Sequence, residues 1–224
     1  RSHDGSLYLP LFTAPPGFSE FHLFTDLYAS EARILGELDP DTGDVKRIFG
    51  RFSPIYTENP RVRTFSIFDF EILPDGELIV SYGADSLLHR FDLEFNHLQS
   101  FGFSGKYKSN AYSELPDVSD ANELRRHMFR EVSEKDFYTS LSCISEQSVC
   151  FRSYRISSDS LRDGLQIYRD DVLLADIMVP KTGDHRNSNY FRIAGFSEPW
   201  FYSNIHFDEM NEQKFIYRLQ ITNL

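Results

Sequence analysis

The chain has 224 residues, enough to bury a sizeable core in one large domain or two small ones. Its formal net charge of −11 argues against nucleic-acid binding, because contacts to phosphates depend on clustered Lys and Arg. The 21 Phe and 12 Tyr residues, punctuated by Gly, Asp and Pro, favour strands over helices. No apolar run approaches the roughly 18 residues that a membrane-spanning helix requires.

Strand-like runs recur from end to end and fall into groups. The first group comprises residues 7–12, 21–27, 33–38 and 45–49. The second comprises residues 65–72, 78–82, 87–92 and 97–101. The third comprises residues 137–143, 149–154, 165–168 and 172–179. A final group of three covers residues 190–196, 200–207 and 215–221.

The first two groups end in similar segments, 45–50 and 97–102, which lie 52 residues apart. A four-stranded unit repeated along an all-β chain is typical of propeller blades, whereas a β-sandwich has no reason to repeat in fours. The sequence therefore predicts an all-β protein, a β-propeller with about four blades. Residues 1–224 form a single propeller domain or the C-terminal segment of one.

One helix is expected to interrupt the strands near residues 120–132. Asp120 followed by Glu123 has the spacing of a capping box, in which each side chain satisfies a backbone N–H at the start of a helix. Leu124, Met128 and Val132 then recur on one helical face.

The two cysteines, Cys143 and Cys150, flank a predicted hairpin that turns at residues 146–147. That register places them opposite each other on adjacent strands, close enough for a disulfide. Either a disulfide or a pair of reduced, half-buried thiols fits the sequence. A zinc site does not, because no further Cys or paired His has ligand spacing.

Two stretches carry a resemblance to a known class of proteins. Phe24-Thr25-Asp26, then Arg33-Ile34 and Leu38-Asp39, resembles the YWTD repeat. The run from Pro74 to Ser81, then Leu88 to Asp92 and Phe101-Gly102, resembles an NHL repeat, although Ser81 stands where that repeat usually has Asp.

The chain is thus similar to six-bladed propellers of the NHL, YWTD and TolB-like kind, and to uncharacterised propeller proteins of Bacteroidetes that are often lipoproteins. The resemblance implies a six-bladed ring with two blades outside this chain, and a periplasmic or cell-surface location. It also implies a binding role more often than catalysis, although fold alone does not decide function.

Catalytic signatures are few, and no catalytic residue, metal ligand or cofactor site is predicted. Asp69 and Glu71 alternate on one face of a strand, so a glycoside hydrolase or related hydrolase that uses channel-lining carboxylates is the alternative function. Trp200, Phe201 and Tyr202 form either a sugar-stacking shelf or part of a buried strand.

Charge is distributed unevenly along the chain. The links between strand groups, residues 51–63, 103–136 and 181–190, hold 11 of the 23 Lys and Arg but 9 of the 34 Asp and Glu. These links therefore carry a net +2 while the remainder carries −13. A relatively electropositive mouth for an anionic ligand would follow, although long solvated loops also carry mixed charges. The candidate ligand-binding residues are Arg51, Arg61, Arg63, His185 and Arg186.

The favoured function is a non-catalytic binding or scaffolding module for an anionic or glycan ligand or a protein partner. Open blade edges would also permit self-association, because unpaired strand edges invite pairing with another chain.

Overall fold

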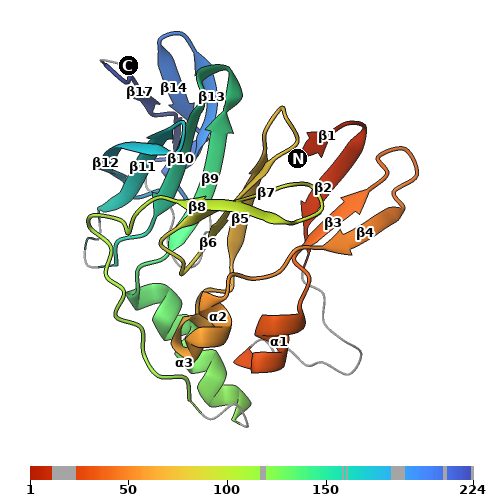
Figure 1. Ribbon diagram of the computed structural model, residues 1–224. Helices are drawn as coiled ribbons and strands as arrows, with labels where there is room; N and C mark the ends of the chain where they lie inside the picture. Colours follow the sequence, from red (N-terminus) through yellow and green to blue (C-terminus); the bar gives the residue numbers. More distant parts are fainter. Residues whose placement is uncertain are drawn as a thin grey trace.

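The computed structural model describes residues 1–11, 24–116, 120–157, 159, 161–182, 190–208 and 211–222. The described chain is mostly β and forms several antiparallel sheets (Figure 1). Three of these sheets have four strands each, and in each the strands lie side by side in chain order. The described strands close into neither a barrel nor a propeller ring, so the expected propeller is not seen and the fold is antiparallel and mostly β.

The first sheet contains β1 (Ser2–His3), β2 (Ser6–Pro10), β3 (Leu35–Leu38) and β4 (Val45–Phe49). The strand expected over residues 21–27 is wrong from residue 24 onward, and residues 21–23 lie outside the described chain. Thr25 instead caps the helix α1 (Asp26–Glu31), its hydroxyl accepting from the Tyr28 N–H at 3.3 Å. A hydroxyl acceptor followed by an acid is a helix start, and this local signal overrides the aromatic strand-like pattern.

The second sheet matches its prediction closely. It contains β5 (Phe68–Ile72), β6 (Leu78–Tyr82), β7 (Leu88–Phe91) and β8 (His97–Phe101). Gly76, at φ 87°, closes the β5–β6 turn by donating its N–H to the Leu73 carbonyl at 3.0 Å. The strand expected over residues 65–72 begins only at Phe68. A 3₁₀ helix occupies Pro60–Phe65 before it, with Pro60 in its first turn.

The third sheet contains β9 (Tyr138–Ile144), β10 (Val149–Tyr154), β11 (Arg162–Arg169) and β12 (Val172–Pro180). A short 3₁₀ turn over Ser145–Gln147 joins β9 to β10. Cys143 and Cys150 are register partners, with Cα atoms 4.0 Å apart, and form a disulfide. The predicted register is confirmed, and the structure resolves the open choice in favour of the bonded form.

The last group of strands is divided between two small sheets. One contains β13 (Ile193–Ser197), β14 (Trp200–Ser203) and β17 (Arg218–Leu219). The other is the hairpin of β15 (His206–Asp208) and β16 (Gln213–Phe215). The single strand expected over residues 200–207 is therefore interrupted near Asn204, whose N–H donates to the Arg192 carbonyl at 2.8 Å.

The helices gather at one end of the molecule, below the sheets in Figure 1. They are α1, the short α2 (Ile55–Glu58) and α3 (Ala121–Glu134). The predicted helix is confirmed: the Asp120 carboxylate accepts from the N–H groups of Asn122 and Glu123 at 2.9 and 3.0 Å. None of the described helices is long and apolar enough to cross a membrane.

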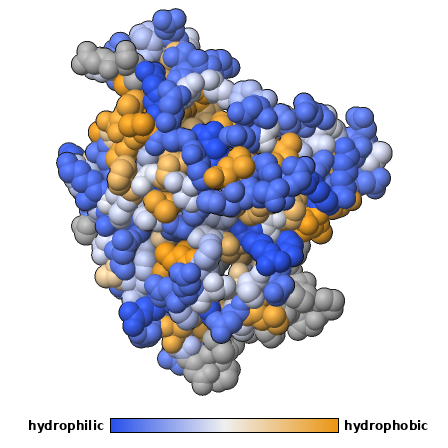
Figure 2. Space-filling model, in the orientation of Figure 1, coloured by the Kyte–Doolittle hydropathy of each residue, from blue (hydrophilic) through white to orange (hydrophobic). Residues whose placement is uncertain are grey.

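Apolar residues fill the spaces between neighbouring sheets. Tyr8 and Leu35 of the first sheet pack with Phe70 of the second, while Phe151 of the third meets Phe201 of β14 with ring centroids 5.0 Å apart. On the face drawn in Figure 2, hydrophilic residues dominate and hydrophobic ones form small separate patches. The core is thus a series of inter-sheet layers, each burying one face of two sheets.

Arg152 on β10 joins the second and third sheets through a fully buried guanidinium. It donates to the Ser81 hydroxyl and the Ser86 carbonyl, both at 2.8 Å, and to the Asp85 carbonyl at 2.6 Å. The ring of Tyr138 lies 3.3 Å from the guanidinium carbon. Burial lowers the pKa of Arg152, so carbonyl dipoles and an aromatic face offset the loss of hydration.

Replacement of Arg152 by Ala should lower the free energy of unfolding by about 3 kcal/mol or more, because several buried carbonyls lose their donor. Urea titration followed by fluorescence measures the change. Arg162→Ala, at an exposed position of the same sheet, is the matched control. Equal unfolding midpoints for the two variants would contradict the assigned role.

His206 is buried among Phe191, Phe215 and Tyr217, and neither ring nitrogen has a hydrogen-bond partner in the described residues. Burial lowers the pKa of His206. The unfolded chain therefore binds a proton more readily, and stability is lost as pH falls from the unfolded value of about 6.5 toward the folded one. His206→Phe should raise the urea midpoint more at pH 5.5 than at pH 7.5. An equal gain at both pH values would show that the imidazole does not titrate in this way.

Candidate functional site

A hollow of about 640 Å³ lies between β4 of the first sheet and β7 and β8 of the second. We call it the aromatic cleft, because rings supply much of its wall. Its ring-bearing residues are Phe49, Phe52, Tyr82, His89, Phe91, Phe95 and His97. Its volume falls within the range typical of small-molecule sites, roughly 300–1,000 Å³.

Phe95, in the β7–β8 turn, is held in the cleft wall by an unusual backbone. Its φ of 65° is left-handed, a conformation that costs a bulky residue roughly 1–3 kcal/mol. The turn is fixed by the Phe95 N–H donating to the Asp92 carbonyl at 3.0 Å and by Asn96 donating to the Asp92 carboxylate at 2.8 Å. A Cβ on Gly50 would lie 3.1 Å from the Phe95 ring, so Gly50 leaves the space that the ring needs.

A chain of polar side chains leads from the protein interior to the cleft surface. Buried Asp85 contacts His89 Nε2 at 2.9 Å, and His89 Nδ1 contacts the Ser100 hydroxyl at 2.9 Å. His97 Nε2 in turn lies 2.7 Å from that hydroxyl. Ser53 also donates to the Asp85 carboxylate.

The direction of these hydrogen bonds follows from Asp85, which as a carboxylate can only accept. With neutral imidazoles, His89 then carries its proton on Nε2, Ser100 donates to His89 Nδ1, and His97 donates to Ser100. Burial alone would raise the pKa of Asp85, but the hydrogen bonds from His89, Ser53 and the Leu87 N–H outweigh it and hold that pKa below its usual value.

Positive charge lies at the edge of the cleft. Arg51 lines it, is exposed, and has no ion-pair partner in the described part of the chain. The Tyr82 hydroxyl donates to the Arg51 carbonyl at 2.7 Å and so fixes the Arg51 backbone against the second sheet. Arg33 and Glu94 also line the cleft, so the arginines outnumber the acid there.

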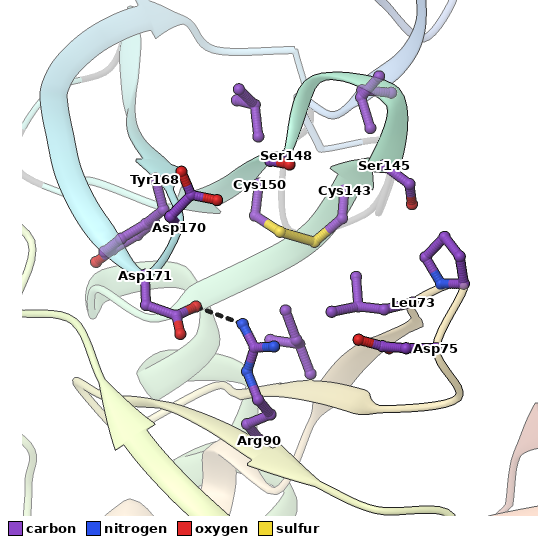
Figure 3. Close-up of a pocket in the computed structure, with 14 residues that line it drawn as sticks. Leu73, Asp75, Arg90, Cys143, Ser145, Ser148, Cys150, Tyr168, Asp170 and Asp171 are labelled. Atoms are coloured by element: carbon purple, nitrogen blue, oxygen red, sulfur yellow. Dashed lines mark hydrogen bonds and ion pairs between the residues drawn. A yellow bond between two sulfur atoms is a disulfide. The ribbon is translucent and has the colours of Figure 1, made fainter.

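A second hollow, of about 260 Å³, lies between the second and third sheets (Figure 3). The disulfide forms one side of it, opposite Leu73 and Asp75. Arg90 points across it to the Asp171 carboxylate at 2.6 Å and also donates to Glu77 at 2.6 Å. This hollow is smaller than the aromatic cleft. It is also less suited to an anion, because Arg90 is already paired with two carboxylates.

The structure separates the predicted ligand-binding residues. Of these residues, Arg51 lines the aromatic cleft, whereas Arg61 is paired with Glu114. Arg63 is buried and donates to the Tyr56 and Phe24 carbonyls, each at 2.8 Å, and to the Asp26 carboxylate. His185 and Arg186 lie outside the described residues. Arg63 thus anchors α1, and only Arg51 is placed in a described hollow.

The carboxylates of the hydrolase alternative, Asp69 and Glu71, are bound by two arginines. Arg1 lies 3.4 Å from Asp69 and 2.6 Å from Glu71, while Arg192 lies 3.6 and 3.0 Å from them. Asp69 also accepts from the Leu141 N–H at 2.9 Å. Burial raises the pKa of Glu71 despite these arginines. These ion pairs join the starts of β1 and β13 to β5, so both acids have a structural role.

The aromatic run on β14 is partly covered. Phe201 is buried, and the Arg218 guanidinium lies over the Trp200 ring, 4.5 Å from its centroid. A flat sugar-stacking shelf needs exposed ring faces on neighbouring residues. The run on β14 therefore fits the alternative of a partly buried strand better than a sugar-binding shelf.

Asp85, His89, Ser100 and His97 were not predicted as site residues, although one signal for them was present. The strands over residues 87–92 and 97–101 were correctly expected, and their hairpin register pairs His89 with Ser100. Contact of those two side chains follows from that pairing. The position of β4, which belongs to another sheet, cannot be predicted in this way, because no local sequence pattern indicates which sheets lie next to each other.

Comparison with known proteins places the fold but not the function. No family model matches the chain, and no curated protein matches it. A solved structure of a DUF4221 family member from Bacteroides vulgatus is similar, with a TM-score of 0.65 at 10% identity. The similarity covers 99% of this chain and 63% of that chain, so the chain spans less than two thirds of the protein that it matches.

The expected resemblance to six-bladed propellers of the NHL, YWTD and TolB-like kind is therefore wrong. The similar structure is a DUF4221 family protein, and the described sheets form no closed ring. The YWTD-like residues fail for a physical reason, since Thr25 and Asp26 begin a helix rather than continue a strand.

Proposed function

We propose that the chain is a binding module whose ligand site is the aromatic cleft and whose ligand is anionic. The observation that carries the proposal is Arg51, a cation without an ion-pair partner in the described chain, at the edge of a ring-lined hollow of ligand size. Apolar walls supply binding free energy and a few polar groups fix orientation, which is the usual composition of small-molecule sites. Catalysis by Asp69 and Glu71 is disfavoured because arginines bind both acids.

The sheets would act as the scaffold of this module. Three successive four-stranded sheets in chain order support blade-like units in an open arc, with the cleft between the first two. The proposal also includes binding of a protein or glycan partner, and self-association through exposed strand edges. A periplasmic or cell-surface location is supported by the Cys143–Cys150 disulfide, because such bonds persist in oxidising compartments.

Ligand-observed NMR against a library of anionic, neutral and cationic small molecules and short glycans tests the proposal. Anionic compounds should bind, and Arg51→Glu should weaken them about tenfold or more, which corresponds to about 1.4 kcal/mol. Arg162→Glu, a charge reversal at an exposed site on the third sheet, should leave binding unchanged. If anionic compounds bind Arg51→Glu as tightly as the unchanged protein, or if no anionic compound binds, this site is excluded.

Acyl hydrolysis is a second candidate function, favoured by the Asp85–His89–Ser100 chain. A nucleophile within hydrogen-bond reach of a base that a third group orients is the general arrangement for covalent catalysis. Ser100 Oγ would attack an ester carbonyl and pass its proton to His89 Nδ1, which returns it to the leaving alcohol. Water would then release the acid and restore Ser100.

A fluorophosphonate probe, read by intact mass, tests the second candidate. The protein should gain one adduct, and Ser100→Ala should abolish it while Ser104→Ala, at another exposed serine, should not. An unlabelled protein, or an adduct that persists in Ser100→Ala, would leave Ser100 without a nucleophilic role.

A further inference from the structure

We infer that the ligand of the aromatic cleft is a flat aromatic ring that carries one carboxylate-like negative charge. The inference rests on the proposed binding function and adds the chemical class of the ligand. It follows from three features of the cleft: continuous ring contacts, the strained position of Phe95, and the type of polar group at the edge.

Most rings of the cleft wall form one connected series. Phe91 and Phe95 stack with centroids 4.1 Å apart and planes at 12°, and Phe49 meets Phe95 at 6.1 Å in an edge-to-face arrangement. Tyr82 meets His89 at 5.6 Å, and His89 stacks beside Phe91 at 6.3 Å. A planar ring can extend such a series by offset or edge-to-face contact, whereas a saturated ring offers no complementary quadrupole.

The backbone strain at Phe95 is a separate observation. Gly or Asn would occupy its left-handed position at lower cost, yet a large ring stands there and packs in the cleft wall. Gly50, itself at φ 74°, provides the space opposite that ring. Retained strain of this kind is commonly found at ligand sites, where the surrounding structure holds the residue in place.

The polar groups of the cleft suit an anion better than a sugar. The described lining contains Arg33 and Arg51, one carboxylate at Glu94, and neither Asn nor Gln. Recognition of sugar hydroxyls relies on amides, which donate and accept, and on carboxylates, which accept, whereas a guanidinium only donates and pairs with a carboxylate. The hydrogen-bond chain from His97 to Asp85 runs inward, which leaves Arg51 as the exposed cation for the ligand.

Isothermal titration with three probes of similar size tests the inference: 2-naphthoate, decalin-2-carboxylate and naphthalene-2-carboxamide. The aromatic anion should bind about tenfold more tightly than either the saturated anion or the neutral aromatic amide. Phe95→Leu, which keeps an apolar side chain but removes the ring, should erase the preference for 2-naphthoate over decalin-2-carboxylate. Phe101→Leu, which removes a ring from the same hairpin outside the cleft, should preserve it.

The outcomes separate the inference from the function on which it rests. Equal binding of the two anions, both weakened by Arg51→Glu, would overturn the aromatic inference and leave the anion site standing. Equal binding of 2-naphthoate and its amide would overturn the charge requirement. If no probe responds to Arg51→Glu, the proposed site itself fails. Thermal unfolding of each variant confirms that it is folded before titration.

Discussion

The buried guanidinium of Arg152 fixes the geometry on which the candidate site depends. It projects from the third sheet and binds the carbonyls of Asp85 and Ser86, in the turn between β6 and β7 of the second sheet. The carboxylate of that same Asp85 orients His89, and His89 orients Ser100 in the aromatic cleft. A cation on one side of the second sheet therefore positions a carboxylate that serves the other side.

This arrangement requires a positive charge to remain buried among dipoles and rings rather than beside a carboxylate. The buried charge of Arg152 also affects Lys108. The pKa of Lys108 is lowered to about 8, mainly by burial and next by the nearby Arg152 charge. Lys108 lies over the rings of Tyr112 and Tyr138, at 5.3 and 5.1 Å, and Tyr138 also faces Arg152. Aromatic faces thus lie beside both cations where the segment around Lys108 packs against Tyr138 of the third sheet.

The sequence predicted what is local and missed what joins distant segments. Hairpins such as β7–β8 and β9–β10 were predictable because turn residues and alternation set their register, and the Asp120 cap located α3. The helix at residues 26–31 was missed because aromatic content outweighed the Thr25 cap. Arg63 resembled a free cation in the sequence, yet Asp26 and two carbonyls bind it.

The distribution of paired charges explains why the aromatic cleft, rather than the acids of β5, is the better candidate site. On β5, Asp69 and Glu71 bind Arg1 and Arg192, so four charges neutralise one another and hold sheets together. Beside the second hollow, Arg90 binds Glu77 and Asp171. Charges that already satisfy one another gain little from a ligand, because binding would first have to break those pairs. Arg51 has no such pair in the described chain, and the rings beside it supply the apolar contact that an organic anion needs.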